Sequence, residues 1–291
     1  MRHNPPCRSG RRNPAMADVA SISRHYARGD IAAGLLAALR EAEGAEVPLT
    51  PWTLAPLDQF HGRGLDATAE LAGLLAPRDG DHILDIGAGL GGPARWIAAQ
   101  HGCEVTALDL IAEYCAAADT LTAACGLTGR VRAVPGSATD LPFADASFDH
   151  VFSQNAIMNI ADKPRFYAEA FRVLRPGGAF ALAQITLGPA GPPDYPQPWA
   201  SDSATSFLDP PEAIARHARE AGFTLVALHD TTAACIAAQE EARRRIAASG
   251  PPRLGMHVLM GASLIPAMRN NARAMAEGRL GAFDCLLRKP L

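Results

Sequence analysis

The feature that most constrains the fold of this chain is an apolar run that passes through an acidic residue into alternating glycines, at residues 82–92. Asp85 lies within the apolar part, and Gly87, Gly89 and Gly91 follow it. Glycines at this spacing let the chain turn sharply and let a ligand approach the backbone, because no Cβ atom is in the way. A proline then opens a helix whose first amide groups face the same space. The run predicts a strand, a ligand-binding turn and a helix, in that order.

The glycine run alone does not decide which ligand binds. Gly87, Gly89 and Gly92 also match the G-x-G-x-x-G pattern of dinucleotide-binding proteins. A second buried strand is predicted to end at Asp109, about 20 residues after the turn, where a carboxylate can hold ribose hydroxyls. Both kinds of cofactor use such a carboxylate, so the choice depends on the rest of the chain.

Two motifs further along the chain distinguish the two kinds of cofactor. Residues 141–149 run Leu-Pro-Phe-Ala-Asp-Ala-Ser-Phe-Asp, and residues 172–178 run Arg-Val-Leu-Arg-Pro-Gly-Gly. Together with Asp85 just before the first glycine, they resemble the motifs of class I methyltransferases that use S-adenosylmethionine. The resemblance extends over residues 58–289. It implies an enzyme that binds S-adenosyl-L-methionine and transfers the methyl group to a small-molecule acceptor.

A narrower resemblance is found at residues 58–64, 153–157, 277–283 and 288–290. These segments are similar to the branch that contains sarcosine and dimethylglycine N-methyltransferases, with a methyltransferase type 11 domain. That branch also includes enzymes that act on quinones, sterols and other small acceptors, so nitrogen, oxygen and carbon all stay open as the methylated atom. Two other functions are considered. A nicotinamide-dependent oxidoreductase would share the glycine turn without the two later motifs, and a non-catalytic S-adenosylmethionine-binding protein would lack an acceptor pocket.

Composition favours one elaborated domain that acts on small molecules. The chain has 291 residues, 48% hydrophobic and 20% charged, which is enough for a large single core. The net charge of −3 gives no basic field for a nucleic acid, and no apolar run reaches the ~18 residues of a membrane helix. The scattered cysteines form no C-x-x-C pair and are expected to be reduced packing residues. We expect a cytoplasmic protein without nucleic acid partner, membrane insertion or metal.

Periodicity predicts an α/β fold with a doubly wound, mostly parallel, seven-stranded Rossmann-like sheet. The fold is expected to carry N-terminal capping helices and a helical insertion before the last strand. Strands are predicted at 82–86, 104–109, 131–135, 148–154, 178–185, 223–230 and 282–288, and core helices at 93–101, 112–125 and 162–174.

The same pattern predicts one domain with a short tail. Asp209 is expected to be the N-cap of a helix that opens at Pro210. The predicted parts are a disordered tail at 1–16, a domain at 17–291, and within it a helical cap at 17–78, a cofactor-binding core at 79–188 and a C-terminal half at 189–291 with a lid at 231–281.

The resemblance implies a set of cofactor-binding residues. Ser137 departs from the family pattern, because many relatives have an aspartate there and a hydroxyl accepts from the adenine amino group more weakly. Asp85 has a second interpretation, in which it orients the glycine turn through backbone N–H groups, and the amides of Gln154 and Asn155 could cap the following turn. The set is Gln59, Asp85, Gly87, Gly89, Asp109, Leu110, Ser137, Ala138, Gln154 and Asn155.

Methyl transfer from a sulfonium needs few catalytic side chains, because the methyl group is already activated and the enzyme chiefly aligns the acceptor. No nucleophile elbow, metal-spaced cluster or phosphate-binding loop is present. His61 and His257 are the candidate bases, since histidine titrates near neutrality, although His61 also fits a cofactor-covering role. The sequence therefore assigns no catalytic residue.

The topology predicts an acceptor pocket rich in apolar and aromatic side chains, each of which could instead belong to the core. An acceptor with a carboxylate would need a buried arginine, for which Arg269, Arg273 and Arg279 are candidates, although cations at helical spacing more often form a solvated face. The predicted pocket residues are Met158, Asn159, Tyr195, Trp199, Phe207, Met256, His257 and Met260.

Overall fold

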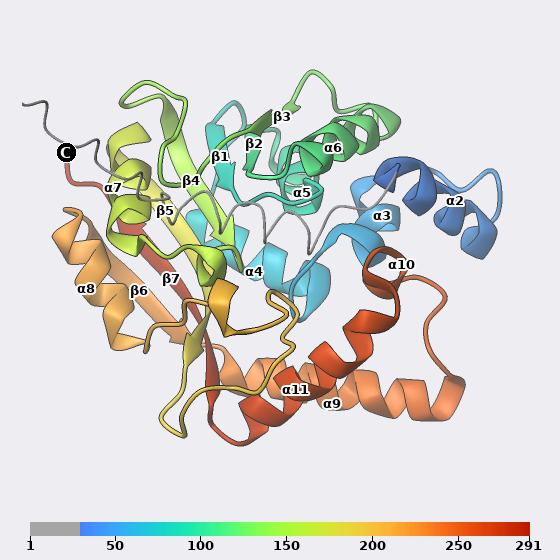
Figure 1. Cartoon of the computed structure of the whole chain (residues 1–291). Coiled ribbons are helices and arrows are strands. Elements are labelled where there is room, and N and C mark those ends of the chain that lie inside the picture. The colour runs from blue at the N-terminus through green and yellow to red at the C-terminus, as the bar shows by residue number, and fades with distance from the viewer. Residues whose placement is uncertain (1–29) are drawn as a thin grey trace, which may run out of the picture.

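The apolar runs of the sequence become the strands of one seven-stranded sheet (Figure 1). The structure is a computed structural model that describes residues 30–291. The predicted tail at 1–16 and the predicted start of the domain at residue 17 lie outside the described residues. The strands are β1 His82–Ile86, β2 Glu104–Asp109, β3 Val131–Pro135, β4 Phe148–Gln154, β5 Leu174–Leu187, β6 Thr224–Asp230 and β7 Leu280–Arg288.

The order of the strands across the sheet is β3-β2-β1-β4-β5-β7-β6. Neighbouring strands from β3 to β5 pair in parallel, whereas β7 is antiparallel to both β5 and β6. The chain moves outward from β1 to β3 and then returns to the other side of β1 as β4. A ligand site is expected at such a switch point, beyond the carboxyl ends of the strands. The predicted fold class is confirmed.

Helices cover both faces of the sheet. On one face, α4 and α5 pack against Ile83, Val105 and Phe152, and on the other, α7 and α8 pack against Leu84 and Phe180. None of the described helices combines the length and apolar character needed to cross a bilayer. The helices of the sheet layers are α4 Gly64–Leu75, α5 Gly92–His101, α6 Ala112–Ala124, α7 Lys163–Val173 and α8 Glu212–Glu220, with short 3₁₀ turns at η1 Ile157–Asn159 and η2 Ser203–Thr205.

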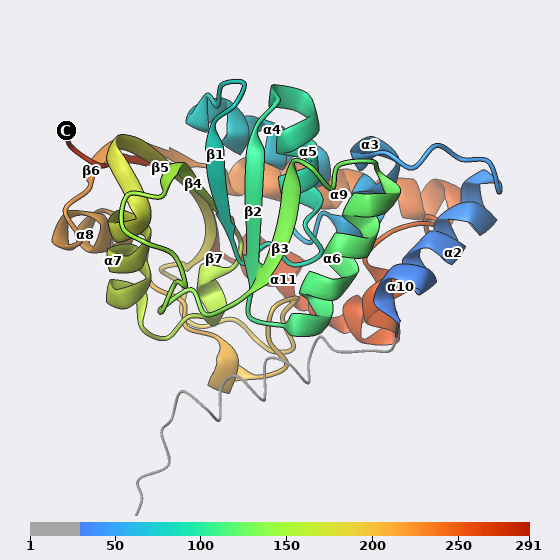
Figure 2. The same cartoon turned by 90° about the horizontal axis from the view of Figure 1, so that it is seen from above.

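The N-terminal helices and the insertion before β7 meet at one end of the molecule, where α10 lies beside α2 (Figures 1 and 2). The side chain of Arg253, which precedes α10, donates to the carbonyls of Glu41 and Ala42 in the last turn of α2, at 2.8 and 2.9 Å. Leu254 and Val258 pack against the core cluster that contains Leu35 and other α2 residues. The elements are α2 Ile31–Glu43, α3 Pro51–Asp58, α9 Thr232–Ser249, α10 His257–Met260, η3 Gly261–Ser263 and α11 Leu264–Ala276.

The first four strands have the predicted bounds, but the later ones differ. β5 begins earlier than predicted, because Leu174 already pairs with Phe148 of β4. The pairing resumes at Ala179, after an irregularity in register that includes Gly177 and Gly178. A Cβ atom on Gly178 would lie 2.7 Å from the carbonyl oxygen of Asp149, so glycine permits this close approach. β6 begins at Thr224 and β7 at Leu280, each shifted slightly from the prediction.

The predicted N-cap at Asp209 is wrong. Pro211 occupies the cap position of α8 and makes no side-chain cap bond. The carboxylate of Asp209 instead pairs with Nε2 of His217, at 3.1 Å, and lies 3.9 Å from Nζ of Lys163. A tertiary contact has therefore replaced the local capping role that the sequence indicated.

Candidate active site

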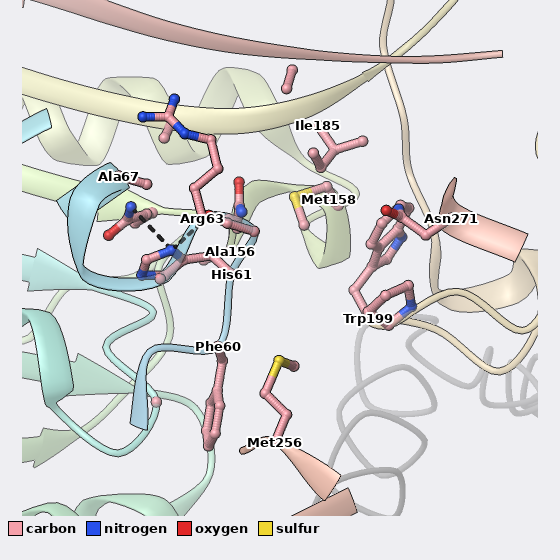
Figure 3. A pocket seen from close by; sticks show the side chains of 18 of the residues that line it. Phe60, His61, Arg63, Ala67, Ala156, Met158, Ile185, Trp199, Met256 and Asn271 are labelled. Atoms are coloured by element: carbon pink, nitrogen blue, oxygen red, sulfur yellow. Dashed lines mark hydrogen bonds between the residues drawn. The ribbon is translucent and has the colours of Figure 1, made fainter. Parts of the chain in front are cut away.

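One continuous cavity of about 2230 Å³ extends from the glycine turn to the helices before β7. Phe60 and His61 lie on one side of the pocket, and Trp199 and Asn271 lie on the other (Figure 3). Among the predicted cofactor residues, Gln59 is buried outside the cavity lining. The others all line it: Asp85, Gly87, Gly89, Asp109, Leu110, Ser137, Ala138, Gln154 and Asn155.

Gly87 and Gly89 of the turn are required to be glycine for different physical reasons. Gly87 has φ 77°, and a Cβ atom there would lie 2.2 Å from the Cβ of Ala156, so the position has no room within the protein itself. Gly89 has φ 55°, and its Cβ atom would make an ordinary contact of 3.4 Å with the ring of Phe60. Gly89 therefore faces the cavity, whereas Gly87 packs against the chain after β4.

Asp109 holds the glycine turn at the end of β2. Its carboxylate accepts hydrogen bonds from the backbone N–H groups of Gly89, at 2.8 Å, and Ile111, at 3.0 Å. Burial raises the pKa of Asp109, and these two N–H groups oppose that rise. A carboxylate has about four acceptor sites, so Asp109 retains capacity to accept from ligand hydroxyls in the cavity that it lines.

Asp85 is a buried carboxyl group that lines the cavity and lacks a partner for Oδ2 among the described residues. It is 1% exposed, and burial raises its pKa to about 8, with a further increase from the charge of Asp109. The alternative in which Asp85 orients the turn does not match the contacts. The turn N–H groups of Gly87 and Ala88 donate to the carbonyl of Leu108, at 2.8 and 3.0 Å. A buried acceptor without a partner points to a ligand group.

A buried polar cluster joins the N-terminal cap to the end of β4. Thr68 donates to Oε1 of Gln59, at 2.7 Å, and lies 3.0 Å from Oε1 of Gln154. His61 contacts Gln59 through Nε2, at 3.0 Å, and Gln154 through Nδ1, at 3.4 Å. Burial lowers the pKa of His61 to about 4, so the ring is neutral at neutral pH. Gln154 is thus fixed by tertiary contacts and does not cap the following turn.

Two further positions of the predicted cofactor set have local constraints. Asn155 adopts φ 54°, a left-handed conformation that asparagine tolerates better than most residues, and its N–H donates to the carbonyl of Ala183 at 2.9 Å. The hydroxyl of Ser137 accepts from the N–H of Thr139 at 3.2 Å and lies 2.9 Å from the Thr139 hydroxyl. Part of the hydrogen-bonding capacity of Ser137 is therefore used within its own turn.

The predicted acceptor residues divide into those that line the cavity and one that does not. Tyr195 is outside the lining, contrary to expectation, because its ring packs against the cluster around Trp199 and Met275. Asn159 lines the cavity, but its amide nitrogen donates to the carbonyls of Trp199, at 2.9 Å, and Thr205, at 2.8 Å. The other predicted acceptor residues all line the cavity: Met158, Trp199, Phe207, Met256, His257 and Met260.

None of the three candidate arginines forms a buried binding site for a carboxylate of the acceptor. Arg273 pairs with Asp194 at 2.7 Å, and Arg279, which lies outside the cavity lining, pairs with the same carboxylate at 3.1 Å. Arg269 lines the cavity from an exposed position. Arg279 also pairs with Glu277, at 3.1 Å, so the two paired arginines are matched by two carboxylates, Asp194 and Glu277.

Comparisons with known proteins identify the family. A methyltransferase domain model matches residues 84–182. The chain is 32% identical over 216 residues to erythromycin 3''-O-methyltransferase of Saccharopolyspora erythraea, with 69% of each protein covered. The chain belongs to the S-adenosylmethionine-dependent methyltransferases. It is also 27% identical over 210 residues to sarcosine/dimethylglycine N-methyltransferase of Halorhodospira halochloris, covering 72% of this chain and 75% of that protein.

The solved structures agree with this fold. Geranyl diphosphate C-methyltransferase from Streptomyces coelicolor A3(2) matches with a TM-score of 0.69 at 14% identity, covering 96% of this chain and all of that one. The resemblance predicted from the sequence is confirmed, and the nicotinamide-dependent alternative is wrong. The protein is a small-molecule methyltransferase whose methyl donor is S-adenosyl-L-methionine.

The two later motifs that carried the resemblance, residues 141–149 and 172–178, have a mainly structural role in this methyltransferase. The guanidinium of Arg172 donates to the carbonyls of Leu141, at 3.0 Å, and Phe143, at 2.7 Å, and to Glu169 at 2.7 Å. Glu169 in turn accepts from the N–H of Leu141 at 2.9 Å. The two sequence motifs are therefore clamped together beside the start of β4, away from the cavity lining.

Sequence reasoning missed one buried ion pair of the methyltransferase. Arg95 of α5 is fully buried, and its guanidinium contacts the carboxylate of Asp58 in α3 at 2.6 Å. A Cβ atom on Gly92 would lie 2.5 Å from the carbonyl oxygen of Asp58, so the two helices approach each other at a glycine. An arginine on an otherwise apolar helix face was the available signal for this pair.

Proposed function

We propose that this methyltransferase acts on a bulky, largely apolar small molecule. The observation that carries the proposal is the cavity of about 2230 Å³, which exceeds the ~300–1,000 Å³ of ordinary ligand pockets. Its acceptor end is lined by Met158, Trp199, Phe207, Met256 and Met260. One similar protein is named for methylating erythromycin and another for methylating sarcosine and dimethylglycine. The size of the cavity fits an acceptor of the first kind better than one of the second.

We infer that the cofactor occupies the glycine-turn end of the cavity. Three observations fit it: the unpartnered oxygen of Asp85, the spare acceptor capacity of Asp109, and the cavity-facing Gly89 beneath Phe60. Asp109 and Leu110 would hold the ribose, and Ser137 and Ala138 would border the adenine. When bound, S-adenosylmethionine supplies an activated methyl group on a sulfonium.

The residues of this chain would then position the acceptor and exclude water. The buried cluster of Gln59, His61, Thr68 and Gln154 fixes the end of β4, where the acceptor and the methyl group are proposed to meet. A base works best with a pKa near the working pH, so His61, with a pKa of about 4, is a poor proton acceptor. We therefore assign His61 a positioning role through Gln154.

Turnover against two acceptor panels tests the proposal. One panel contains sarcosine and dimethylglycine, and the other contains lipophilic alcohols, phenols and amines, each incubated with S-adenosylmethionine that carries a trideuterated methyl group. We expect labelled product in the lipophilic panel, detected by mass spectrometry. Preference for sarcosine or dimethylglycine would contradict the proposed acceptor class, since those acceptors need little of the apolar wall.

Asp109→Ala should weaken S-adenosylmethionine binding at least tenfold. The variant loses charge-assisted hydrogen bonds to ribose of roughly 1.5 to 3 kcal/mol each, and also the acceptor for the Gly89 N–H. Titration calorimetry measures the change, and Asp140→Ala, which removes an exposed carboxylate outside the cavity lining, is the matched control. An unchanged dissociation constant for Asp109→Ala would show that the ribose is held elsewhere.

Cofactor affinity should rise with pH because of Asp85. With a pKa of about 8 in the free protein, the carboxyl is mostly protonated at neutral pH. The positive charges of S-adenosylmethionine favour the carboxylate, so binding releases a proton and tightens as pH rises toward 8, by up to about tenfold per pH unit. Calorimetry in buffers of different ionisation enthalpy measures the proton release. Asp85→Asn should lose both effects, and wild-type binding without proton release would contradict the assignment.

A further inference from the structure

Asp284 is an acidic residue in the middle of the buried strand β7 and lines the cavity at 8% exposure. Across the sheet it pairs with Ala183 of β5, and Ala183 pairs with Gln154 of β4. Residues paired in this way point to the same face of a sheet. Asp284 therefore lies on the same face as Gln154, two strand spacings or roughly 10 Å from it.

The carboxylate of Asp284 has no hydrogen-bond or ion-pair partner within residues 30–291. The cation beside it, Arg63, pairs instead with Glu70. The other groups that act on it electrostatically are Glu70, which raises its pKa, and His229, which is paired with it across the sheet and lowers it. Burial raises the pKa of Asp284 to about 6, while Arg63 and His229 oppose the rise, so the group is charged at neutral pH. A buried charge without a partner is costly, which points to a ligand that supplies one.

Much of the cavity wall near Asp284 is apolar. Met158, Ile185, Cys235, Ile236 and Met275 belong to the cluster at this end of the cavity. A ligand here meets hydrocarbon and sulfur along its body, and at its end it meets Asp284 beside the paired Arg63 and Glu70, a group whose charges sum to −1. A neutral hydroxyl would supply a hydrogen bond but no counter-charge, whereas a protonated amine supplies both.

We propose that Asp284 pairs with a protonated amine on the acceptor, at a position other than the atom that is methylated. A protonated amine has no lone pair with which to attack a methyl group, so the two groups must be distinct. The proposal rests on the proposed function and deepens it: the acceptor is an apolar molecule with a cationic amine held by Asp284 and a separate nucleophile held near Gln154.

Simple amphiphiles test this proposal. We would titrate octylammonium, 1-octanol and octanoate into the protein saturated with S-adenosylhomocysteine, near neutral pH, and measure binding by calorimetry. Octylammonium should bind at least about tenfold more tightly than 1-octanol, and Asp284→Asn should remove that preference while leaving the affinity for 1-octanol unchanged. Asp66→Asn, which removes an exposed carboxylate that lines the same cavity, is the control.

Each outcome has a distinct meaning. Octylammonium that binds no better than 1-octanol, or that binds Asp284→Asn as well as the wild type, would overturn the role of Asp284. Absence of S-adenosylhomocysteine binding would instead contradict the proposed function, and the comparison of amphiphiles is then made without it. Asp284→Asn should melt at or above the wild-type temperature, because it removes a buried unpaired charge, so loss of amine binding in a folded variant is a loss of recognition.

Discussion

Arg95→Met should lower the free energy of unfolding by about 3 to 5 kcal/mol, because it leaves the buried carboxylate of Asp58 without its partner. Burial already raises the pKa of Asp58 to about 6 although Arg95 opposes the rise. The guanidinium also donates to the carbonyl of Ala118 at 3.2 Å, so the variant loses a contact with α6. Urea denaturation of the variant and the wild type measures the difference.

The matched controls separate the ion pair from the loss of a side chain. Arg40→Met, at an exposed position of α2, should change stability by less than about 0.5 kcal/mol. Combining Arg95→Met with Asp58→Leu should recover much of the loss, because an apolar pair removes the uncompensated charge. An Arg95→Met protein as stable as the wild type would show that Asp58 is neutral in the folded state.

The pH dependence of this pair has a definite sign. The folded-state pKa of Asp58, about 6, is above its ordinary value of 3.8, so the folded protein binds this proton more tightly than the unfolded chain does. The contribution of Asp58 to stability therefore decreases as pH rises from about 4 to about 6. In Arg95→Met the decrease should extend to higher pH, because the attraction that lowers this pKa is gone.

The strands, and the residues that line the glycine-turn end of the cavity, could be predicted because both are encoded locally. β1 to β4 are short apolar runs bounded by turn residues, and most of the predicted cofactor residues lie at the carboxyl ends of these strands or shortly after them. The pairing of residues far apart is not encoded in this way. Asp58 and Arg95 are 37 residues apart, and Thr68 and Gln154 are 86 apart. Periodicity identifies each segment but does not show which side chains meet.

Some errors came from local rules that tertiary contacts override. Asp209 has the residue type and spacing of an N-cap, yet it pairs with His217 on the side of the same helix. The expected topology and its aromatic character placed Tyr195 in the pocket, and the structure packs it, partly buried, against a neighbouring cluster. Asp284 is the opposite case, because a charge inside the apolar strand Leu280–Arg288 was visible in the sequence as a departure from its surroundings.

Gly89→Val should abolish S-adenosylmethionine binding while the protein stays folded. A Cβ atom at this position meets only the ring of Phe60, at 3.4 Å, and the left-handed φ of 55° adds about 1 to 3 kcal/mol of backbone strain. The two methyl groups of valine extend into the cavity where the backbone is proposed to approach the cofactor. Calorimetry with S-adenosylmethionine and thermal unfolding measure the two effects separately.

Gly87→Ala is the control that distinguishes a packing role of the turn glycines from a binding role. Its Cβ atom would lie 2.2 Å from that of Ala156, so the smaller substitution should destabilise the fold more than valine does at Gly89. The expected pattern is a folded Gly89→Val protein without cofactor binding and a less stable Gly87→Ala protein. If Gly89→Val binds normally, the cofactor does not contact this part of the turn. If both variants unfold alike, the turn glycines serve packing alone, and the binding role falls to Asp85 and Asp109.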